Sequence, residues 1–173
     1  WKITASIPSI KKLVICVAPH TSNWDFIIGK LFYTALGGKA SFLIKQEWLK
    51  PPVGKLLINM GAIGVNRWKN TSLTDQLAKV FQEKEEFHLA ITPEGTRKKV
   101  DKWKLGFYQI AKKAGVPIAM ITIDYRNKEV SVLGIYEPTD DEEKDINMIK
   151  SFYENAHAKY PSQFSLGKDY KQV

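Results

Sequence analysis

The chain has 173 residues, of which 26 are basic and 18 acidic, so its formal net charge is +8. This length suits a single α/β domain, residues 1–173, with a substantial buried core. One cysteine excludes an internal disulfide, and no apolar run approaches the roughly 20 residues that a membrane-spanning helix needs.

Strand and helix patterns alternate along the chain. The apolar run 13–17 is typical of a buried strand, and a helix follows it with Trp24, Ile27 and Leu31 at amphipathic spacing. The later segments are a strand at 40–44, a short helix at 53–60, a strand at 61–65, a helix after Ser72, a strand at 87–92, a helix at 105–114, strands at 116–123 and 129–135, and a helix from 140 to about 160. The alternation predicts a mostly parallel β-sheet flanked by helices.

The excess of positive charge favours an anionic partner: a phosphorylated small molecule, an acidic carrier protein, an anionic membrane surface or nucleic acid. The basic stretch 98–104 is expected to be a solvated loop, with docking to an anionic carrier or lipid surface as the alternative. Position 1 is Trp rather than Met, so the native chain can extend beyond these residues and carry a membrane anchor there.

His20 and Asp25 lie where the first strand gives way to the first helix. In one continuous helix their side chains point roughly 140° apart, so they meet only if His20 lies in the turn. A carboxylate paired with an imidazole fixes its tautomer, while the other ring nitrogen takes a proton from a hydroxyl. The same stretch also fits a capping box, with Ser22 as N-cap and Asp25 serving the helix start. Local sequence leaves both interpretations open.

Polar clusters follow three predicted strands. They are His20 with Asp25, Asn66 with Arg67, and residues 94–97. The carboxyl ends of parallel strands share one edge of a sheet, where ligands bind in open α/β folds, so these clusters are expected to meet in one cleft.

In the third cluster, Arg97 offers a planar fork to a phosphate, and Gly95 lets backbone amides approach it. Glu94 can orient the arginine or accept a hydrogen bond from a substrate hydroxyl. The alternative is a surface turn with a weak local ion pair. Arg67 is equally open between a phosphate ligand and an exposed charge at a strand end.

Several other chemistries find no pattern in the sequence. Three scattered histidines and one cysteine give no zinc spacing, and no metal is expected. No glycine-rich dinucleotide or phosphate loop and no G-x-S-x-G elbow occurs. Cys16 and His88 are expected in or at the edge of the core.

Four blocks in order resemble the glycerolipid acyltransferase family, typified by the 1-acylglycerol-3-phosphate acyltransferases. The blocks are H-T-S-N-W-D at 20–25, G-A-I-G-V-N-R at 61–67, T-P-E-G-T-R at 92–97 and V-P-I-A-M-I at 116–121. The resemblance implies transfer of a fatty acyl group from acyl-CoA or an acyl carrier protein to a glycerolipid hydroxyl. It implies no cofactor, with His20 as general base and Asp25 holding its tautomer.

The resemblance also assigns binding residues. Those expected to bind the acceptor, most simply 1-acylglycerol-3-phosphate, are Glu94, Gly95, Thr96 and Arg97, with Arg97 on its phosphate and Arg67 in support. Pro117 and its strand are expected to shape the donor or acyl side, and Lys45 and Asn66 are further candidates. Departures from the family pattern occur at Pro19, Gly64, Thr92 and Lys98. They touch the acceptor side, so an amino-lipid or another lysolipid is the alternative acceptor.

The implied location is the cytoplasm, peripheral on the inner face of a membrane. Because the family's membrane-binding helices are not evident, attachment is expected through the basic surface or exposed aromatic residues. A non-catalytic phospholipid-binding module of the same fold is the first rival function. A nucleic-acid-binding domain is the second, and the lack of a recognisable nucleic-acid module counts against it.

Overall fold

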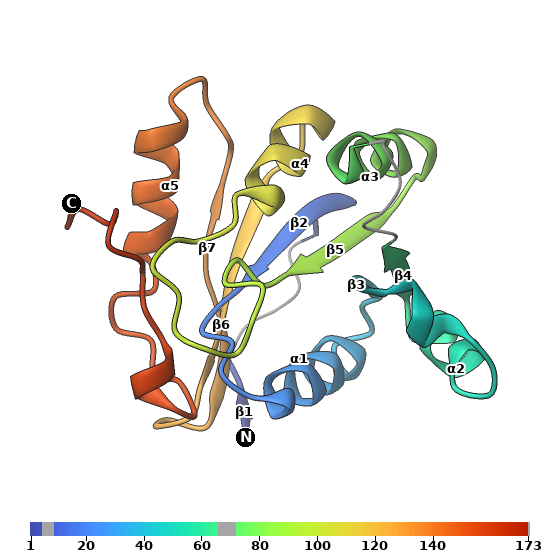
Figure 1. Cartoon of the computed structure of the whole chain (residues 1–173), viewed down its shortest axis with the longest axis horizontal. Coiled ribbons are helices and arrows are strands. Elements are labelled where there is room, and N and C mark those ends of the chain that lie inside the picture. The colour runs from blue at the N-terminus through green and yellow to red at the C-terminus, as the bar shows by residue number, and fades with distance from the viewer. Residues whose placement is uncertain (5–8, 66–71, 173) are drawn as a thin grey trace.

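The computed structural model of the chain describes residues 1–4, 9–65 and 72–172. Within these residues seven strands form one sheet in the order β1-β7-β6-β2-β5-β3-β4 (Figure 1). The strands are β1 (Lys2–Ile3), β2 (Lys12–Val17), β3 (Ala40–Lys45), β4 (Ala62–Val65), β5 (Phe87–Ile91), β6 (Ile118–Asp124) and β7 (Glu129–Tyr136). The helices are α1 (Asn23–Ala35), η1 (Gln46–Leu49), α2 (Gly54–Asn59), α3 (Leu73–Glu83), α4 (Gly106–Ala114), α5 (Glu142–Ser151) and η2 (Pro161–Gln163).

The sheet is mostly parallel, which confirms the predicted fold class. Strands β6, β2, β5, β3 and β4 are each parallel to their neighbours in that order, whereas β7 is antiparallel to β6 and β1 is parallel to β7. The antiparallel strand follows from the short link between β6 and β7, because a parallel crossover needs a dozen or more residues. Asp124 closes this link by accepting a hydrogen bond of 2.8 Å from the amide of Asn127.

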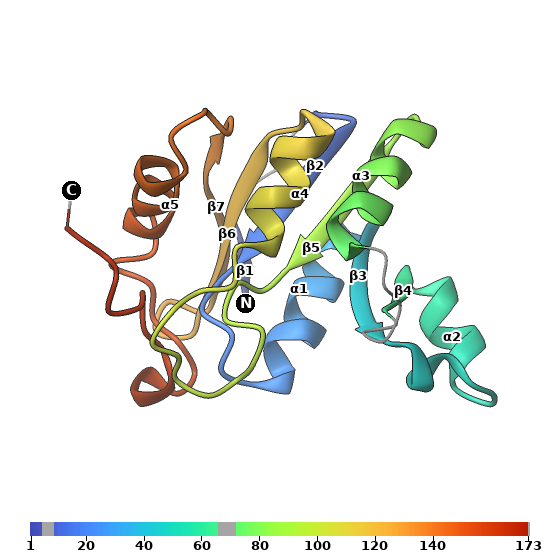
Figure 2. The same cartoon turned by 45° about the horizontal axis from the view of Figure 1, so that its top comes forward.

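Strand β2 lies in the middle of the sheet and contributes to a core on each side. Val14 and Cys16 point into the core beneath α3, α4 and α5, and Leu13 and Ile15 point into the core beneath α1. Figure 2 shows α3 and α4 together on one face of the sheet and α1 on the other. Burial on both faces explains why residues 13–17 of this strand are all apolar. Burial also raises the pKa of the Cys16 thiol, so this cysteine is an inert core residue, as expected.

Helix α1 buries less of its apolar surface than an amphipathic core helix does. Phe32 and Tyr33 pack against the sheet, whereas Trp24, Ile27 and Leu31 are 54%, 41% and 65% exposed. The helix covers the sheet along one flank only, so part of its apolar face remains open to the surroundings.

The last helix is shorter than predicted, since α5 ends at Ser151 rather than near residue 160. Beyond it, Tyr153, Glu154 and Ala156 donate backbone hydrogen bonds to carbonyls three residues back, as in successive turns. These turns bring Tyr153 into the core, where its hydroxyl donates to the Cys16 carbonyl at 2.7 Å. The chain beyond the helix is thus anchored to the core by a residue far away in sequence.

Candidate active site

The turn between β2 and α1 forms the centre of the site. Ser22 is the N-cap of α1, and its hydroxyl oxygen accepts a hydrogen bond of 3.2 Å from the Trp24 amide. Asp25 accepts in return from the Ser22 amide through Oδ2 at 2.8 Å. The capping box is thus complete and fixes the first turn of the helix.

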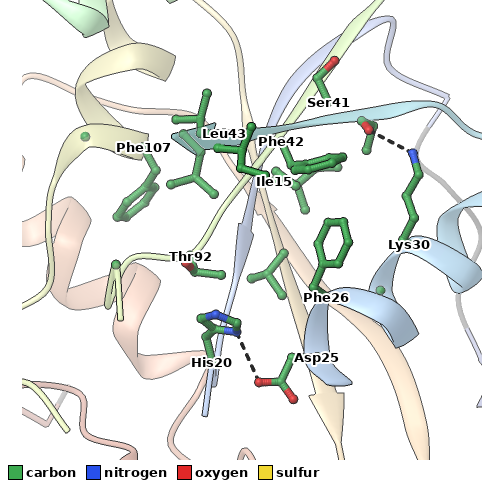
Figure 3. A pocket seen from close by; sticks show the side chains of 18 of the residues that line it. Ile15, His20, Asp25, Phe26, Lys30, Ser41, Phe42, Leu43, Thr92 and Phe107 are labelled. Carbon is green, nitrogen blue, oxygen red and sulfur yellow. Dashed lines mark hydrogen bonds and ion pairs between the residues drawn. The ribbon is translucent and has the colours of Figure 1, made fainter. Parts of the chain in front are cut away.

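The same carboxylate faces His20. Nδ1 of His20 lies 3.2 Å from Oδ2 of Asp25, and the Asp25 side chain is 2% exposed (Figure 3). Oδ2 also accepts a hydrogen bond of 2.8 Å from the Thr21 amide. Nδ1 of His20 is close enough to Oδ2 for an ion pair, but the two groups are poorly aligned for a hydrogen bond. The two interpretations of this stretch therefore hold together, because capping is what brings Asp25 back to the histidine.

The surroundings of Asp25 favour its charged form. Burial opposes ionisation, but the contact with His20 and the hydrogen bonds from Tyr125 and the amides of Ser22 and Thr21 outweigh it and hold the pKa of Asp25 below its usual value. Tyr125 donates to Oδ1 at 2.6 Å. The carboxylate can thus stabilise an imidazolium, and it leaves Nε2 of His20 as the nitrogen that can face a substrate.

Glu94 lies behind the histidine rather than in the cavity wall. Its Oε1 accepts a hydrogen bond of 2.8 Å from the His20 amide, and the residue is 2% exposed. Oε2 has no hydrogen-bond partner among the described residues. Burial raises the pKa of Glu94 to about 7, and the hydrogen bond from His20 offsets this only in part. The structure thus gives Glu94 a backbone-holding contact that the sequence did not predict.

The loop after β5 carries a glycine that the local geometry requires. Gly95 has a φ of 62°, and a Cβ added there would lie 2.9 Å from Cδ of Lys104. The guanidinium of Arg97 donates to Oδ1 of Asn23 at the start of α1. Arg97 is therefore held at the end of the site where His20 lies, and the side chain of Lys104 lies over Gly95 in the same loop.

A cavity of about 760 Å³ opens beside these residues. Figure 3 shows His20, Asp25 and Thr92 at one end of it, with Phe26, Phe42 and Phe107 further along. The cationic side chains in its wall are Lys30, Lys45, Arg97 and Lys104, and among the described lining residues Asp25 is the one carboxylate. Apolar side chains from α1, β2, β3 and β6 make up much of the remaining wall. The cavity suits a ligand with an apolar tail and an anionic head.

The cavity brings together only part of the predicted set. His20, Asp25, Lys45, Gly95 and Arg97 line it, and Glu94 and Thr96 do not.

Pro117 lies at the opposite edge of the sheet, where its carbonyl accepts from the Val14 amide at 3.0 Å, although Ile121 and Ile123 of the strand it precedes reach the cavity wall. The predicted residues Asn66 and Arg67 lie outside the described residues.

Three residues of the site were missed. Lys30, Lys104 and Tyr125 had no motif to mark them, although Lys104 belongs to the basic stretch interpreted as a loop. Lys30 projects from α1, and its ammonium donates to the carbonyls of Met60 at 2.6 Å and Ala40 at 3.3 Å. Burial lowers the pKa of Lys30.

The described part of the chain has no cluster of three His, Cys, Asp or Glu side chains that could hold a metal ion. None of its helices is both long and apolar enough to cross a bilayer.

Comparison with known proteins identifies the family of the chain. The model of the Acyltransferase family matches residues 3–124, more than half of the chain, so the chain belongs to this family. The expectation of an acyltransferase enzyme is confirmed.

Among solved structures, the 1-acyl-sn-glycerophosphate (LPA) acyltransferase PlsC from Thermotoga maritima has a similar fold. Its TM-score is 0.57 at 21% identity, covering 89% of this chain and 68% of that one. No curated protein matches the chain.

Proposed function

We propose that the chain transfers a fatty acyl group from acyl-CoA or an acyl carrier protein to the hydroxyl of a lysophospholipid, with 1-acylglycerol-3-phosphate as the preferred acceptor. The observation that carries this proposal is the His20–Asp25 pair at one end of an apolar cavity whose wall holds four cationic side chains. The PlsC structure of similar fold is named for an acceptor of this kind.

The proposed reaction needs only a base and a positioned alcohol. Nε2 of His20 takes the proton of the acceptor hydroxyl as its oxygen attacks the thioester carbonyl carbon. The carbon–sulfur bond breaks when the tetrahedral intermediate collapses, and the imidazolium returns its proton to the departing thiolate. Asp25 stabilises the imidazolium between these two steps. The thioester is already activated, so no covalent enzyme intermediate is required.

The cations in the cavity wall support an acceptor with a phosphate group. Arg97 presents a fork that matches phosphate geometry, and Lys104 stands over Gly95 beside it. A phosphate bound there would place the rest of a lysolipid toward the apolar part of the cavity. An amino-lipid acceptor is the alternative, because Thr92 and Lys98 depart from the family pattern near this end.

We also propose that the protein works on an anionic membrane surface. The α2 segment, residues 46–60, exposes Trp48, Val53, Leu56 and Ile58, and it carries exposed lysines at 50 and 55. Apolar side chains among lysines suit the boundary between anionic headgroups and acyl chains. Trp48 also lines the cavity, so a lipid can pass from the membrane into the site along this segment.

The test is an acyl-transfer assay with labelled acyl-CoA and acyl carrier protein against lysophosphatidate, lysophosphatidylethanolamine and monoacylglycerol. We expect transfer to lysophosphatidate, and His20→Ala should lower it about 10²- to 10⁴-fold while lysolipid binding persists. His88→Gln is the control and should retain acyl transfer. His88 is also a histidine, but it lies outside the cavity wall, where it is hydrogen-bonded to Tyr33.

Two results would reject the proposal. Full turnover by His20→Ala would remove the general base. A wild-type chain that binds lysolipids but acylates none would be a phospholipid-binding module.

A further inference from the structure

We propose that Tyr125 is a positioning residue for the His20–Asp25 pair, and that the chain beyond the family-matched residues completes the site through it. This inference rests on the proposed role of that pair. The match to the family ends at residue 124, and Tyr125 is the next residue.

The contact between Tyr125 and Asp25 links residues 100 positions apart. The phenolic hydroxyl donates to Oδ1 of Asp25 at 2.6 Å. Oδ2 accepts from the amides of Thr21 and Ser22. Each carboxylate oxygen thus has its own donor, so the plane of the carboxylate cannot rotate without losing a hydrogen bond. This keeps Oδ2 directed at His20.

Tyrosine is well suited to this position. Burial, together with the hydrogen bond and the charge of Asp25, raises the pKa of Tyr125 far above physiological pH, so its hydroxyl remains a donor. The phenol is neutral, unlike an arginine or a lysine. It orients Asp25 without neutralising the charge that the imidazolium of His20 requires.

Tyr125 is itself held by the C-terminal strap, which we define as residues 157–160. The amide of Tyr125 donates to the carbonyl of His157 in the strap at 2.9 Å. At the other end of the chain, Trp1 packs edge-to-face on the ring of Tyr125, with centroids 5.1 Å apart. The ring of His157 lies 3.1 Å from Asp124, the residue before Tyr125.

The strap also contacts the turn between β2 and α1 directly. The amide of Tyr160 donates to the hydroxyl of Thr21 at 3.3 Å. The ammonium of Lys159 lies 5.5 Å from the ring of Trp24 and 5.9 Å from that of Tyr125. Two distant parts of the chain, Tyr125 and the strap, therefore support the first turn of α1, and Tyr125 is the one whose hydroxyl donates to the carboxylate.

The experiment compares Tyr125→Phe with Tyr136→Phe in the acyl-transfer assay. Each variant removes one hydroxyl from a tyrosine that donates to a buried carboxylate, since Tyr136 donates to Asp145 at 2.7 Å, away from the site. Both rings stay in place, so similar melting temperatures are expected. Loss of a hydrogen bond to a charged group predicts a fall in kcat of about 10- to 100-fold for Tyr125→Phe, with KM within about twofold of wild type.

The pH profile separates positioning from a structural role. Without its donor, Asp25 keeps its proton to a higher pH, so the acid limb of kcat against pH should move upward in Tyr125→Phe and stay in place in Tyr136→Phe. The inference is overturned if Tyr125→Phe has the kcat of the wild type and the same acid limb of kcat against pH. It is also overturned if Tyr136→Phe loses as much activity as Tyr125→Phe. His20→Ala in the same assay tests the proposed function separately. An inactive His20→Ala beside a fully active Tyr125→Phe rejects only the role of Tyr125.

Discussion

Asp25 performs two tasks with one side chain. It accepts the amide of Ser22 to start α1, and it lies 3.2 Å from His20 through the same oxygen. A residue that only capped the helix could be exposed, whereas Asp25 is buried with a donor on each oxygen. The same carboxylate starts the helix and faces His20, so a spacing of five residues can bring the two side chains of the proposed pair together.

Glu94 predicts a pH dependence of stability. Its pKa is raised from 4.5 to about 7 in the folded protein, so the folded state holds this proton more tightly than the unfolded state does. Stability from this group is therefore present below pH 4.5 and is lost as the pH rises to about 7. Glu94→Gln keeps an acceptor for the His20 amide but cannot ionise. Relative to that variant, the wild type should lose about 3 kcal/mol of unfolding free energy between these pH values, measured by urea unfolding. A constant difference would contradict the assignment.

Lys104 predicts a selective effect on the acceptor. Lys104→Ala should raise the KM for lysophosphatidate about 10- to 100-fold, because it removes a charged partner of the phosphate. Monoacylglycerol, which has no phosphate, should show little change. Lys102→Ala is the matched control, since Lys102 is exposed and lies outside the cavity wall. An equal effect on both acceptors would show that Lys104 acts on the fold rather than on the phosphate.

At the scale of the element, α1 and the α2 segment both expose apolar side chains on their outer surfaces, and both also contribute residues to the cavity wall. Phe26 and Lys30 reach it from α1, and Trp48 reaches it from η1. Neither surface is explained by the core, because the sheet covers only the flank of α1 that carries Phe32 and Tyr33. The proposed contact with a membrane surface would give these side chains a role.

The membrane proposal predicts that α2 controls binding to vesicles. Leu56→Ser with Ile58→Ser removes two side chains that are 61% and 53% exposed. We expect at least about tenfold weaker binding to anionic vesicles in a sedimentation assay, since each apolar side chain contributes on the order of 1 kcal/mol or more. Ile135→Ser on β7 is the control, as Ile135 is 46% exposed. Unchanged binding in the double variant would locate the docking surface elsewhere.

At the scale of the whole molecule, the parallel strands gather the site at one edge. Residues after β2, β3 and β5 meet there, as the alternation of strands and helices in the sequence predicts. His20, Asp25 and Arg97 line one cavity as expected, because strand polarity brings the turn after β2 and the loop after β5 to one edge and the capping box brings Asp25 back to His20.

The remaining features depend on contacts between distant residues, which no local pattern reveals. Tyr125 and Glu94 act on residues 100 and 74 positions away, respectively. Tyr153, just beyond the end of α5, is bonded to Cys16 in the core, 137 positions away. Pro117 itself lies away from the cavity wall, but it precedes β6, whose other end reaches the wall through Ile121 and Ile123, so the contribution of this strand to the acyl side stays a prediction.

The most direct test of the His20–Asp25 pair is a double-mutant cycle on kcat with His20→Ala, Asp25→Asn and the double variant. If Asp25 acts only through the imidazole, the double variant should be no slower than His20→Ala alone. Reductions in kcat that multiply across the two sites would show that Asp25 contributes independently of His20, and would contradict the mechanism.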